Sequence, residues 1–192
     1  TGSSHKTFPG PQGGFLLSSS EDETFHRKLN NAMFPGVCSS YHLHHVAGKV
    51  MALAEFMEYG EAYARDIVSN AQTFAGALAA EGFDVLAESR GYTASHQVLT
   101  RHGELDSGAG AKAAQLLEDA GIITNMNMLP GDTKAMTPSG LRLGVQELTR
   151  VGFSKDDMEV VASFYARVLL HGEEPAAVRK DVHELKQNRQ TI

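Results

Sequence analysis

The strongest helical pattern of the chain lies between residues 43 and 80. Apolar residues recur there at three- and four-residue steps, which is the spacing of one helix face. Two helices are predicted, the second from about Glu61 to Ala80, with a bend permitted at Gly60 and an end at Gly82. Their apolar positions are Leu43, Val46, Ala47, Val50, Ala54 and Met57 in the first, and Tyr63, Ile67, Ala71, Phe74, Ala75 and Leu78 in the second.

The segment before these helices predicts one strand and one polar helix. Gly13 to Ser18 is a short apolar run bounded by glycines and serines, which suits a buried strand. Residues 19–31 are rich in charge and predict a solvated helix, which leads into a turn at Phe34-Pro35-Gly36.

Beyond Gly82 short strands alternate with helices, which is the pattern of a small α/β layer. Ser154 and Asp157 form a candidate capping box at the start of an amphipathic helix. The predicted strands are residues 83–86, 95–100, 122–124 and 141–144, and the other predicted helices are residues 111–120 and 175–187.

The composition of the chain indicates a globular protein and excludes several kinds of partner. The 192 residues are 42% apolar, which is enough for a real core. The 17 basic and 23 acidic residues give a formal charge of −6 without a basic block, so nucleic acid and anionic membranes are not expected partners. The single cysteine, Cys38, excludes an intrachain disulfide framework, and no apolar stretch approaches the roughly twenty residues of a membrane span. A cytoplasmic protein is the default expectation.

Lys6 is the first candidate for chemistry. It stands among small hydroxyl residues and directly before a run of turn residues. A lysine that attacks an aldehyde must lose its proton near neutral pH, which is favoured by rigid backbone, partial desolvation and a neighbouring potential cation such as His5. A solvated surface lysine, or the remnant of an expression tag, is the alternative interpretation.

Four longer stretches occur in the order of one known family. They are Ser4-His5-Lys6-Thr7-Phe8-Pro9-Gly10-Pro11-Gln12-Gly13-Gly14, Asn31-Ala32-Met33-Phe34-Pro35-Gly36, His44-His45-Val46-Ala47-Gly48-Lys49 and Ser139-Gly140-Leu141-Arg142-Leu143-Gly144. Together they resemble the serine hydroxymethyltransferase family, whose members use pyridoxal 5′-phosphate. The variants in this chain are similar to the archaeal-type branch and its transaldolase relatives.

The resemblance implies an α/β fold, namely pyridoxal phosphate fold type I, as in aspartate aminotransferase. Residues 1–60 would end the cofactor-binding large domain and include an interface helix, and residues 61–192 would form the small C-terminal α/β domain. The chain opens on Thr1 inside what resembles the middle of a family member, so we expect a C-terminal half. The expected partner is the complementary N-terminal half, as a separate subunit or a missing segment, in a homo- or hetero-oligomer with a shared active site.

The resemblance also assigns roles to individual residues. It places the cofactor's Schiff base on Lys6, with His5 and Ser3 beside the cofactor, and His5 joins Lys6 as a catalytic candidate. Arg142 would bind the carboxylate of the amino-acid substrate. Asn125 and Asn127 match a loop that lies near the family's one-carbon carrier, and Asn127 is the substrate-binding candidate of the two. The remaining candidates are Ser39 and Ser40, which stand where two family glycines reach the phosphate of the neighbouring subunit's cofactor.

Structural roles stay open for several of these residues. Taken alone, an arginine in a strand is more often a surface or structural residue, and Ser39 or Ser40 could instead cap the following helix. The histidines at positions 42, 44 and 45 lack a nearby carboxylate or cysteine, so they are interpreted as interface residues and no metal is predicted. Cys38 is expected to be packed.

The predicted function is that of a hydroxymethyltransferase-like enzyme, which makes or breaks the Cα–Cβ bond of β-hydroxy amino acids such as serine, with glycine as the partner product. The alternatives are a pterin-independent aldolase or transaldolase, and a non-catalytic partner subunit. Common family members carry Ser-Pro-Phe before the arginine strand, where this chain has Lys134-Ala135-Met136, and Met128 replaces a small residue. A tetrahydropterin is therefore a possible second cofactor, but ordinary tetrahydrofolate contacts are not expected.

Overall fold

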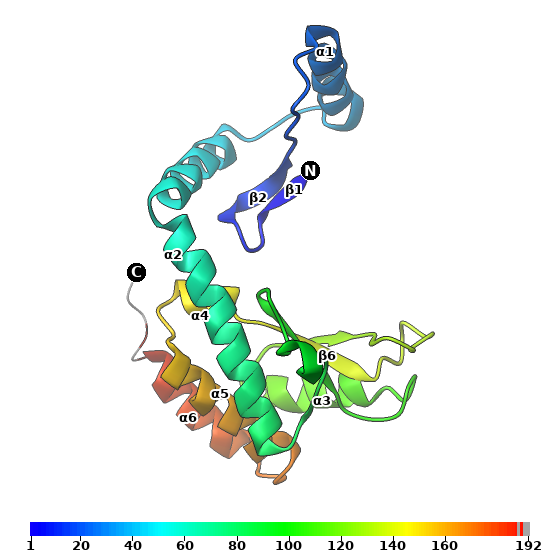
Figure 1. Ribbon diagram of the computed structural model, residues 1–192, viewed down its shortest axis with the longest axis vertical. Coiled ribbons are helices and arrows are strands. Elements are labelled where there is room, and N and C mark those ends of the chain that lie inside the picture. Colours follow the sequence, from blue (N-terminus) through cyan, green and yellow to red (C-terminus); the bar gives the residue numbers. More distant parts are fainter. Residues whose placement is uncertain (188, 190–192) are drawn as a thin grey trace. The chain divides into compact units, whose positions relative to one another are not determined.

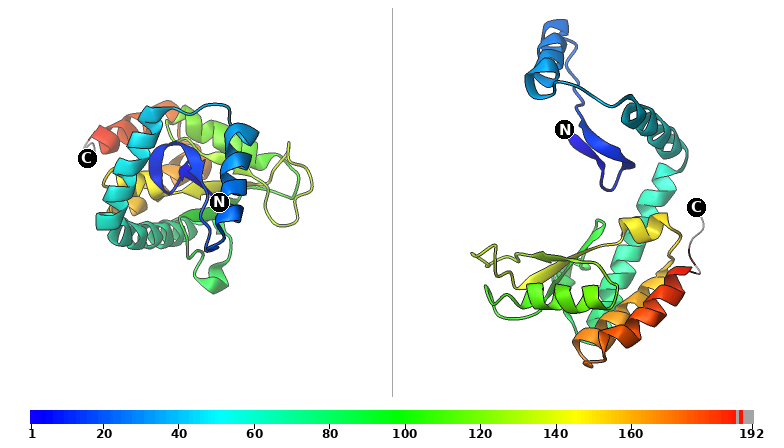
Figure 2. Two further views of the ribbon diagram at one scale, coloured as in Figure 1. Left: turned by 90° about the horizontal axis from the view of Figure 1, so that it is seen from above. Right: turned by 180° about the vertical axis from the view of Figure 1, so that it is seen from behind.

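The computed structural model describes residues 1–187 and 189, and the chain divides into two compact units, Thr1–Glu61 and the part from Ala62 onward. Figure 1 labels the elements, and Figure 2 shows them from two further sides. The long helix α2 (Leu43–Glu81) passes through the boundary, so its first part belongs to one unit and its second part to the other. The assignment of residues 1–60 and 61–192 to a large and a small domain stays a prediction.

The first unit begins with an antiparallel hairpin of β1 (Gly2–His5) and β2 (Pro9–Phe15). The predicted buried strand at residues 13–18 is wrong in extent and burial, because pairing ends at Phe15 and Leu17 is 82% exposed. A two-stranded hairpin offers no second layer under which such residues could be buried.

A helical segment follows the hairpin. Helix α1 (Glu23–Asn31) is capped by Asp22, whose carboxylate accepts a 2.8 Å hydrogen bond from the Thr24 amide, and it continues into the π-helical turn η1 (Ala32–Val37). The polar helix predicted for residues 19–31 is thus present from Glu23 onward, and no residue of α1 is buried.

Helix α2 is one continuous element of 39 residues where the sequence predicted two helices. The predicted boundary is absent because Gly60 lies inside the helix, where a glycine costs only about 1 kcal/mol relative to alanine. The carbonyl of His42 accepts the first amide hydrogen bonds, from His45 and Val46, so neither Ser39 nor Ser40 caps the helix. The predicted end is confirmed, since Gly82 follows α2 with a left-handed φ of 102°.

The second unit contains a four-stranded antiparallel sheet in the order β3-β4-β6-β5. Its strands are β3 (Asp84–Val85), β4 (Gln97–Arg101), β6 (Gly140–Gly144) and β5 (Asn125–Asn127). The predicted strand at residues 122–124 is displaced by three residues, because pairing with β6 begins at Asn125 and Ile123 is 88% exposed.

Helices supply the other layer of this unit, as Figures 1 and 2 show. They are α3 (Ala109–Asp119), α4 (Gln146–Arg150), α5 (Lys155–Leu169) and α6 (Pro175–Gln187), with a short 3₁₀ turn η2 (Glu88–Arg90) before β4. Their side chains share one core with those of α2 and the sheet, including Leu78, Val98, Leu117, Leu141, Leu143 and Met158.

Two local features fix where these helices lie. A Cβ atom at Gly110 would collide with the backbone of Gly140, so the glycine allows α3 to lie directly against β6. The predicted capping box is confirmed at α5, where the carboxylate of Asp157 accepts hydrogen bonds from the Ser154 amide (2.7 Å) and hydroxyl (2.9 Å). Among the described residues, every helix is too short or too polar to span a bilayer.

Candidate functional site

Lys6 lies in the turn between β1 and β2, next to two residues that tie the hairpin together. The hydroxyl of buried Ser4 donates a 2.7 Å hydrogen bond to the carbonyl of Pro11, and Nδ1 of His5 lies 3.3 Å from the carbonyl oxygen of Gly13. The Lys6 amine is exposed and has no hydrogen-bond or ion-pair partner within residues 1–187 and 189. The turn therefore presents a free primary amine. The described residues do not supply the partial desolvation that was expected for this amine.

A second lysine lies against the same hairpin. A Cβ atom added to Gly13 would collide with Nζ of Lys49, and one added to Gly48 would lie 2.6 Å from Cγ of Pro11. The two glycines thus permit the start of α2 to approach β2 closely. Sequence reasoning assigned no role to Lys49, although the motif His-His-Val-Ala-Gly-Lys contains it.

Ser39 and Ser40 lie in the irregular segment between η1 and α2, and both are exposed. Their assignment to a phosphate site is untested, and the helix start that was expected to support it begins three residues later, at Leu43. Cys38 is also exposed, which corrects the prediction of a packed side chain; it belongs to this same extended segment.

Three histidines form a compact cluster at the start of α2. The ring centroids of His42, His44 and His45 lie 4.5 to 5.5 Å apart. Within the part of the chain that the structure describes, no three side chains of metal-binding type are arranged to hold an ion. The cluster is therefore one of imidazoles in tilted and edge-to-face contact at the start of the helix.

Arg142 lies in β6, between β4 and β5, on the sheet face opposite to the core. Its chain neighbours Leu141 and Leu143 are 0% and 3% exposed, whereas Arg142 itself is exposed. Its cross-strand neighbours are Leu99 in β4 and Asn125 in β5. Their side chains share its face of the sheet.

The Arg142 guanidinium has no hydrogen-bond or ion-pair partner among the described residues. Arg101 on the same face, by contrast, is paired with Asp84 at 3.2 Å. The positive charge of Arg142 does act on His96, where burial and then this charge lower the pKa of the imidazole. An unpaired guanidinium on an open sheet face is suited to bind a carboxylate through two parallel hydrogen bonds.

The two asparagines of β5 differ in their hydrogen bonding. The side-chain amide of Asn127 donates a 2.7 Å hydrogen bond to the carbonyl of the adjacent Met128. Asn125 is exposed, and its side chain has no partner in the described part of the chain. Of the two, Asn125 is the one that stands directly beside Arg142.

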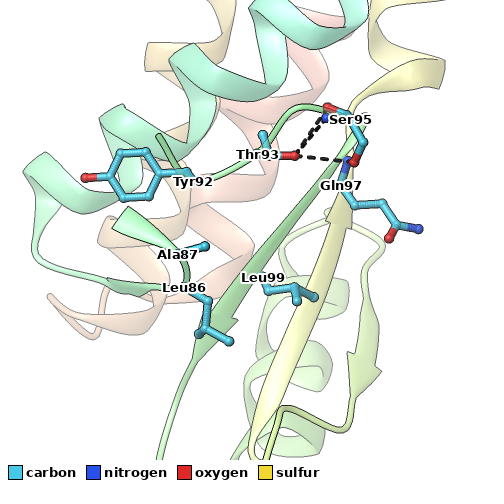
Figure 3. A pocket seen from close by; sticks show the side chains of 7 residues that line it. All are labelled: Leu86, Ala87, Tyr92, Thr93, Ser95, Gln97 and Leu99. Carbon is cyan, nitrogen blue, oxygen red and sulfur yellow. Dashed lines mark hydrogen bonds between the residues drawn. The ribbon is translucent and has the colours of Figure 1, made fainter. Parts of the chain in front are cut away.

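A hollow of about 210 Å³ adjoins this sheet face. Figure 3 shows Thr93, Ser95 and Gln97 near one end of it and Leu86 near Leu99, with the Thr93 hydroxyl hydrogen-bonded to Ser95. The residues that line it are Leu86, Ala87, Tyr92, Thr93, Ser95, Gln97 and Leu99. Because Leu99 is also the cross-strand neighbour of Arg142, the hollow begins one strand away from the guanidinium.

A carboxylate network holds the loop that joins β5 to β6. Asp132 accepts hydrogen bonds from the amides of Leu129 (2.8 Å), Ser139 (3.0 Å) and Asp106 (2.7 Å) and from the Ser139 hydroxyl. Burial opposes ionisation of Asp132, but these hydrogen bonds outweigh it and hold the pKa of the carboxyl well below its usual range. Sequence reasoning missed Asp132, because its donors come from three separate places in the chain.

The predicted site residues therefore fall into two groups. Ser3, His5 and Lys6 lie together on the hairpin of the first unit, while Arg142 and Asn127 lie on one sheet face of the second unit. The roles assigned to these residues are the binding of cofactor and substrate, and they stay predictions.

Comparison with known proteins identifies relatives of the whole chain. The sequence model of the family described as serine hydroxymethyltransferase matches residues 1–165. The serine hydroxymethyltransferase of Pyrococcus abyssi is 55% identical over 196 residues, covering 100% of this chain and 46% of that protein. That of Methanopyrus kandleri is 51% identical and is covered over 44% of its length. The chain thus spans about half the length of the curated relatives it matches.

A solved structure extends the comparison to the fold. The crystal structure of L-threonine transaldolase from Pseudomonas fluorescens, in its internal aldimine state, superposes with a TM-score of 0.88 at 34% sequence identity. The match covers 98% of this chain and 42% of the transaldolase chain. Together with the family match, it confirms the prediction of an α/β chain of fold type I.

Proposed function

This chain belongs to the serine hydroxymethyltransferase family, and from that premise we propose that it takes part in making or breaking the Cα–Cβ bond of β-hydroxy amino acids with pyridoxal 5′-phosphate as cofactor. The observation that carries the proposal is that the family match includes both Lys6 and Arg142, the two cations proposed to hold cofactor and substrate, and that both are unpaired among the described residues. Transfer of a one-carbon unit between serine and glycine is the form of this chemistry suggested by the relatives' names.

Lys6 holds the cofactor covalently through its Nζ in this proposal. The hairpin fits that role, because the turn presents an exposed amine that no described carboxylate neutralises. When bound, the cofactor supplies an electron sink for the bond that breaks at Cα. His5 and Ser3 precede Lys6 on β1, and the contact of His5 with Gly13 fixes the direction of the imidazole.

Arg142 binds the carboxylate of the amino acid. A planar guanidinium can hold a carboxylate by two parallel hydrogen bonds, which fixes the orientation of the bonds at Cα. Placement in the middle of three paired strands keeps the Arg142 backbone in position, with Leu99 and Asn125 on either side. Asn127 on the same face is proposed to lie near the one-carbon carrier or the acceptor aldehyde.

A transaldolase is the second candidate. The match to L-threonine transaldolase favours it, because that protein has the same fold over nearly all of this chain. In that case the amino acid would exchange its β-substituent with an aldehyde, and no pterin would be needed. A non-catalytic partner subunit is the remaining alternative and predicts that Lys6 does not react with the cofactor.

The proposed partner is further polypeptide that covers the first unit, either a complementary segment or another subunit. Among residues 1–61, all of which the structure describes, only Ser4, Ala52 and Gly60 are buried. The first unit leaves large apolar side chains in solvent, including Leu17, Val37, Leu43 and Met57 at 71 to 90% exposure. Apolar surface of this extent marks a site of association. A cytoplasmic location stays a prediction, based on the single cysteine.

The test is chemical tagging of the lysine. Protein mixed with pyridoxal 5′-phosphate is reduced with borohydride, digested and analysed by mass spectrometry. We expect the added pyridoxyl mass on the peptide that contains Lys6, and no stable visible absorbance from the cofactor in Lys6→Arg. Tagging of Lys49 instead, or equal absorbance in Lys6→Arg, would show that Lys6 does not hold the cofactor.

A further inference from the structure

We propose that Asn125 is a second substrate-binding residue, which donates a hydrogen bond from its side-chain amide to the same carboxylate that Arg142 binds. The inference rests on the proposed function, since it assumes an amino-acid ligand at Arg142. It gives Asn125 a role at the substrate carboxylate, whereas the motif resemblance implies only a position near the one-carbon carrier.

Strand register places the two side chains together. Asn125 and Arg142 are direct partners in the antiparallel pairing of β5 with β6, and both are exposed. Directly opposite residues have Cβ atoms about 5 Å apart on one face of the sheet. A carboxylate that is held by the guanidinium is therefore within reach of the Asn125 amide.

Hydrogen bonding then distinguishes Asn125 from its neighbours. The amide of Asn127 is already engaged with the carbonyl of Met128, whereas Asn125 has no side-chain partner among the described residues. On the other flank of Arg142, Leu99 offers no hydrogen-bond donor. Of the two residues directly opposite Arg142, only Asn125 thus offers a donor for a bound carboxylate.

The polarity of the flanks also orients the ligand. A carboxylate bound between Arg142 and Asn125 leaves the less polar part of the amino acid to lie over Leu99 or away from the sheet. The side-chain NH2 group of Asn125 donates hydrogen bonds, and its carbonyl oxygen can point away from the bound anion. An asparagine therefore suits an anion, whereas an aspartate would repel it.

The first experiment measures glycine binding by the change in visible absorbance of the bound cofactor. A lost hydrogen bond to a charged group in a substrate site weakens binding about tenfold to a hundredfold. We expect Asn125→Ala to weaken glycine binding about tenfold and Asn125→Asp by about a hundredfold or more, since the new carboxylate would pair with Arg142. The absorbance of the cofactor without glycine stays unchanged in both variants.

Ile123→Asp is the matched control, because it adds the same charge two residues before Asn125, about 6.6 Å away along an extended chain, at an 88% exposed position outside the strand pairing. We expect it to weaken glycine binding by less than about threefold. Wild-type affinity in Asn125→Ala would overturn the proposal, and so would an equal loss in Ile123→Asp and Asn125→Asp, which would indicate a general effect of surface charge.

A second readout needs no cofactor and separates this inference from the proposed function. Phenylglyoxal modifies free guanidinium groups, and mass spectrometry measures its rate at Arg142, with the ion-paired Arg101 as internal reference. We expect slower modification of Arg142 in Asn125→Asp than in wild type or Ile123→Asp, and protection by glycine that Asn125→Ala reduces. Equal rates in all three proteins, or no protection by glycine, would overturn the inference even where the cofactor binds Lys6. If the cofactor fails to bind Lys6 but the expected labelling pattern is seen, the inference stands and the proposed function falls.

Discussion

At the scale of single residues, Arg142 differs from the ion-paired Arg101 and Arg167, because it has no ion-pair partner among the described residues. Replacement by lysine keeps the charge but removes the two parallel hydrogen bonds that a guanidinium can make. We expect Arg142→Lys to weaken glycine binding by about 1.5 to 3 kcal/mol without changing the cofactor's own absorbance. Spectroscopic titration measures both, and Arg101→Lys serves as the control because Arg101 is bound to Asp84. Unchanged glycine affinity in Arg142→Lys would remove Arg142 from the substrate site.

His102 predicts a dependence of stability on pH. Burial lowers the pKa of its imidazole to about 4, below the ordinary value of 6.5, with Nε2 2.8 Å from the Thr100 hydroxyl and the ring packed on Phe83. The folded state therefore favours neutral His102, so its contribution is present above pH 6.5 and is lost as the pH falls toward 4. We expect a loss on the order of 3 kcal/mol across this range.

Urea unfolding at pH 7.5 and pH 4.5 measures this effect against a matched variant. His102→Gln keeps a polar group beside Thr100 but does not titrate, so it should lose less stability than wild type between the two pH values. His183→Gln, at an exposed position of α6, should behave as wild type. Parallel pH dependence of wild type and His102→Gln would assign the titration to other groups.

Individual residues differ in how far the sequence alone could place them. Lys6 and Arg142 were selected from short motifs, and the structure gives each an open environment without a partner among the described residues. Lys49 was missed because its position against Gly13 depends on the close approach of Gly48 to Pro11, which is a tertiary contact. Asn125 was placed near the one-carbon carrier and not beside the substrate carboxylate, because its relation to Arg142 depends on strand register.

At the scale of elements, the capping box of α5 carries a stability prediction. Ser154 accepts a hydrogen bond from the third helical amide, and Asp157 closes the box on the Ser154 amide while also binding Arg189 at 2.5 Å. Loss of a helix cap costs about 1 kcal/mol. We expect Ser154→Ala to destabilise the protein by that amount and Asp157→Ala by more, as measured by thermal or urea unfolding. A smaller effect for Asp157→Ala than for Ser154→Ala would contradict the assigned hydrogen bonds.

Elements with local signals were predicted more accurately than those that depend on pairing. The capping box, the glycine end of α2 and the last helix at residues 175–187 are encoded within a few residues, and all three are confirmed. The strand predicted at residues 122–124 lies instead at residues 125–127, because the register is set by β6. The division of α2 into two helices was wrong, because one glycine is too weak a signal to end a helix.

At the scale of the whole molecule, the two units differ in how completely their apolar side chains are buried. The second unit has a core that joins its sheet to its helices, while the first has almost none and leaves many apolar side chains exposed. The chain also spans less than half of its curated relatives. Composition could predict a globular core for the chain but not its uneven distribution, because the apolar residues are spread over both units.

The last prediction concerns the second substrate of the proposed reaction. The position where common family members carry Ser-Pro-Phe is occupied by Lys134-Ala135-Met136, in a loop where Met136 is 84% exposed. A lost aromatic contact is worth about 0.5 to 1.5 kcal/mol beyond its buried area, which weakens a folate site without abolishing it. We expect pterin-free cleavage of a bulky β-hydroxy amino acid and only weak acceleration of serine cleavage by tetrahydrofolate.

Assays of serine and of a β-phenyl β-hydroxy amino acid, each with and without tetrahydrofolate, test this expectation. Restoring the aromatic residue by Met136→Phe should strengthen tetrahydrofolate binding if this loop contacts the carrier, while Met126→Phe, on the adjacent strand β5, serves as the control. Since a transaldolase is among the solved structures similar to this chain, pterin-free cleavage would extend the likeness from fold to reaction. Strong dependence on tetrahydrofolate without any pterin-free cleavage would instead place the protein with the ordinary hydroxymethyltransferases.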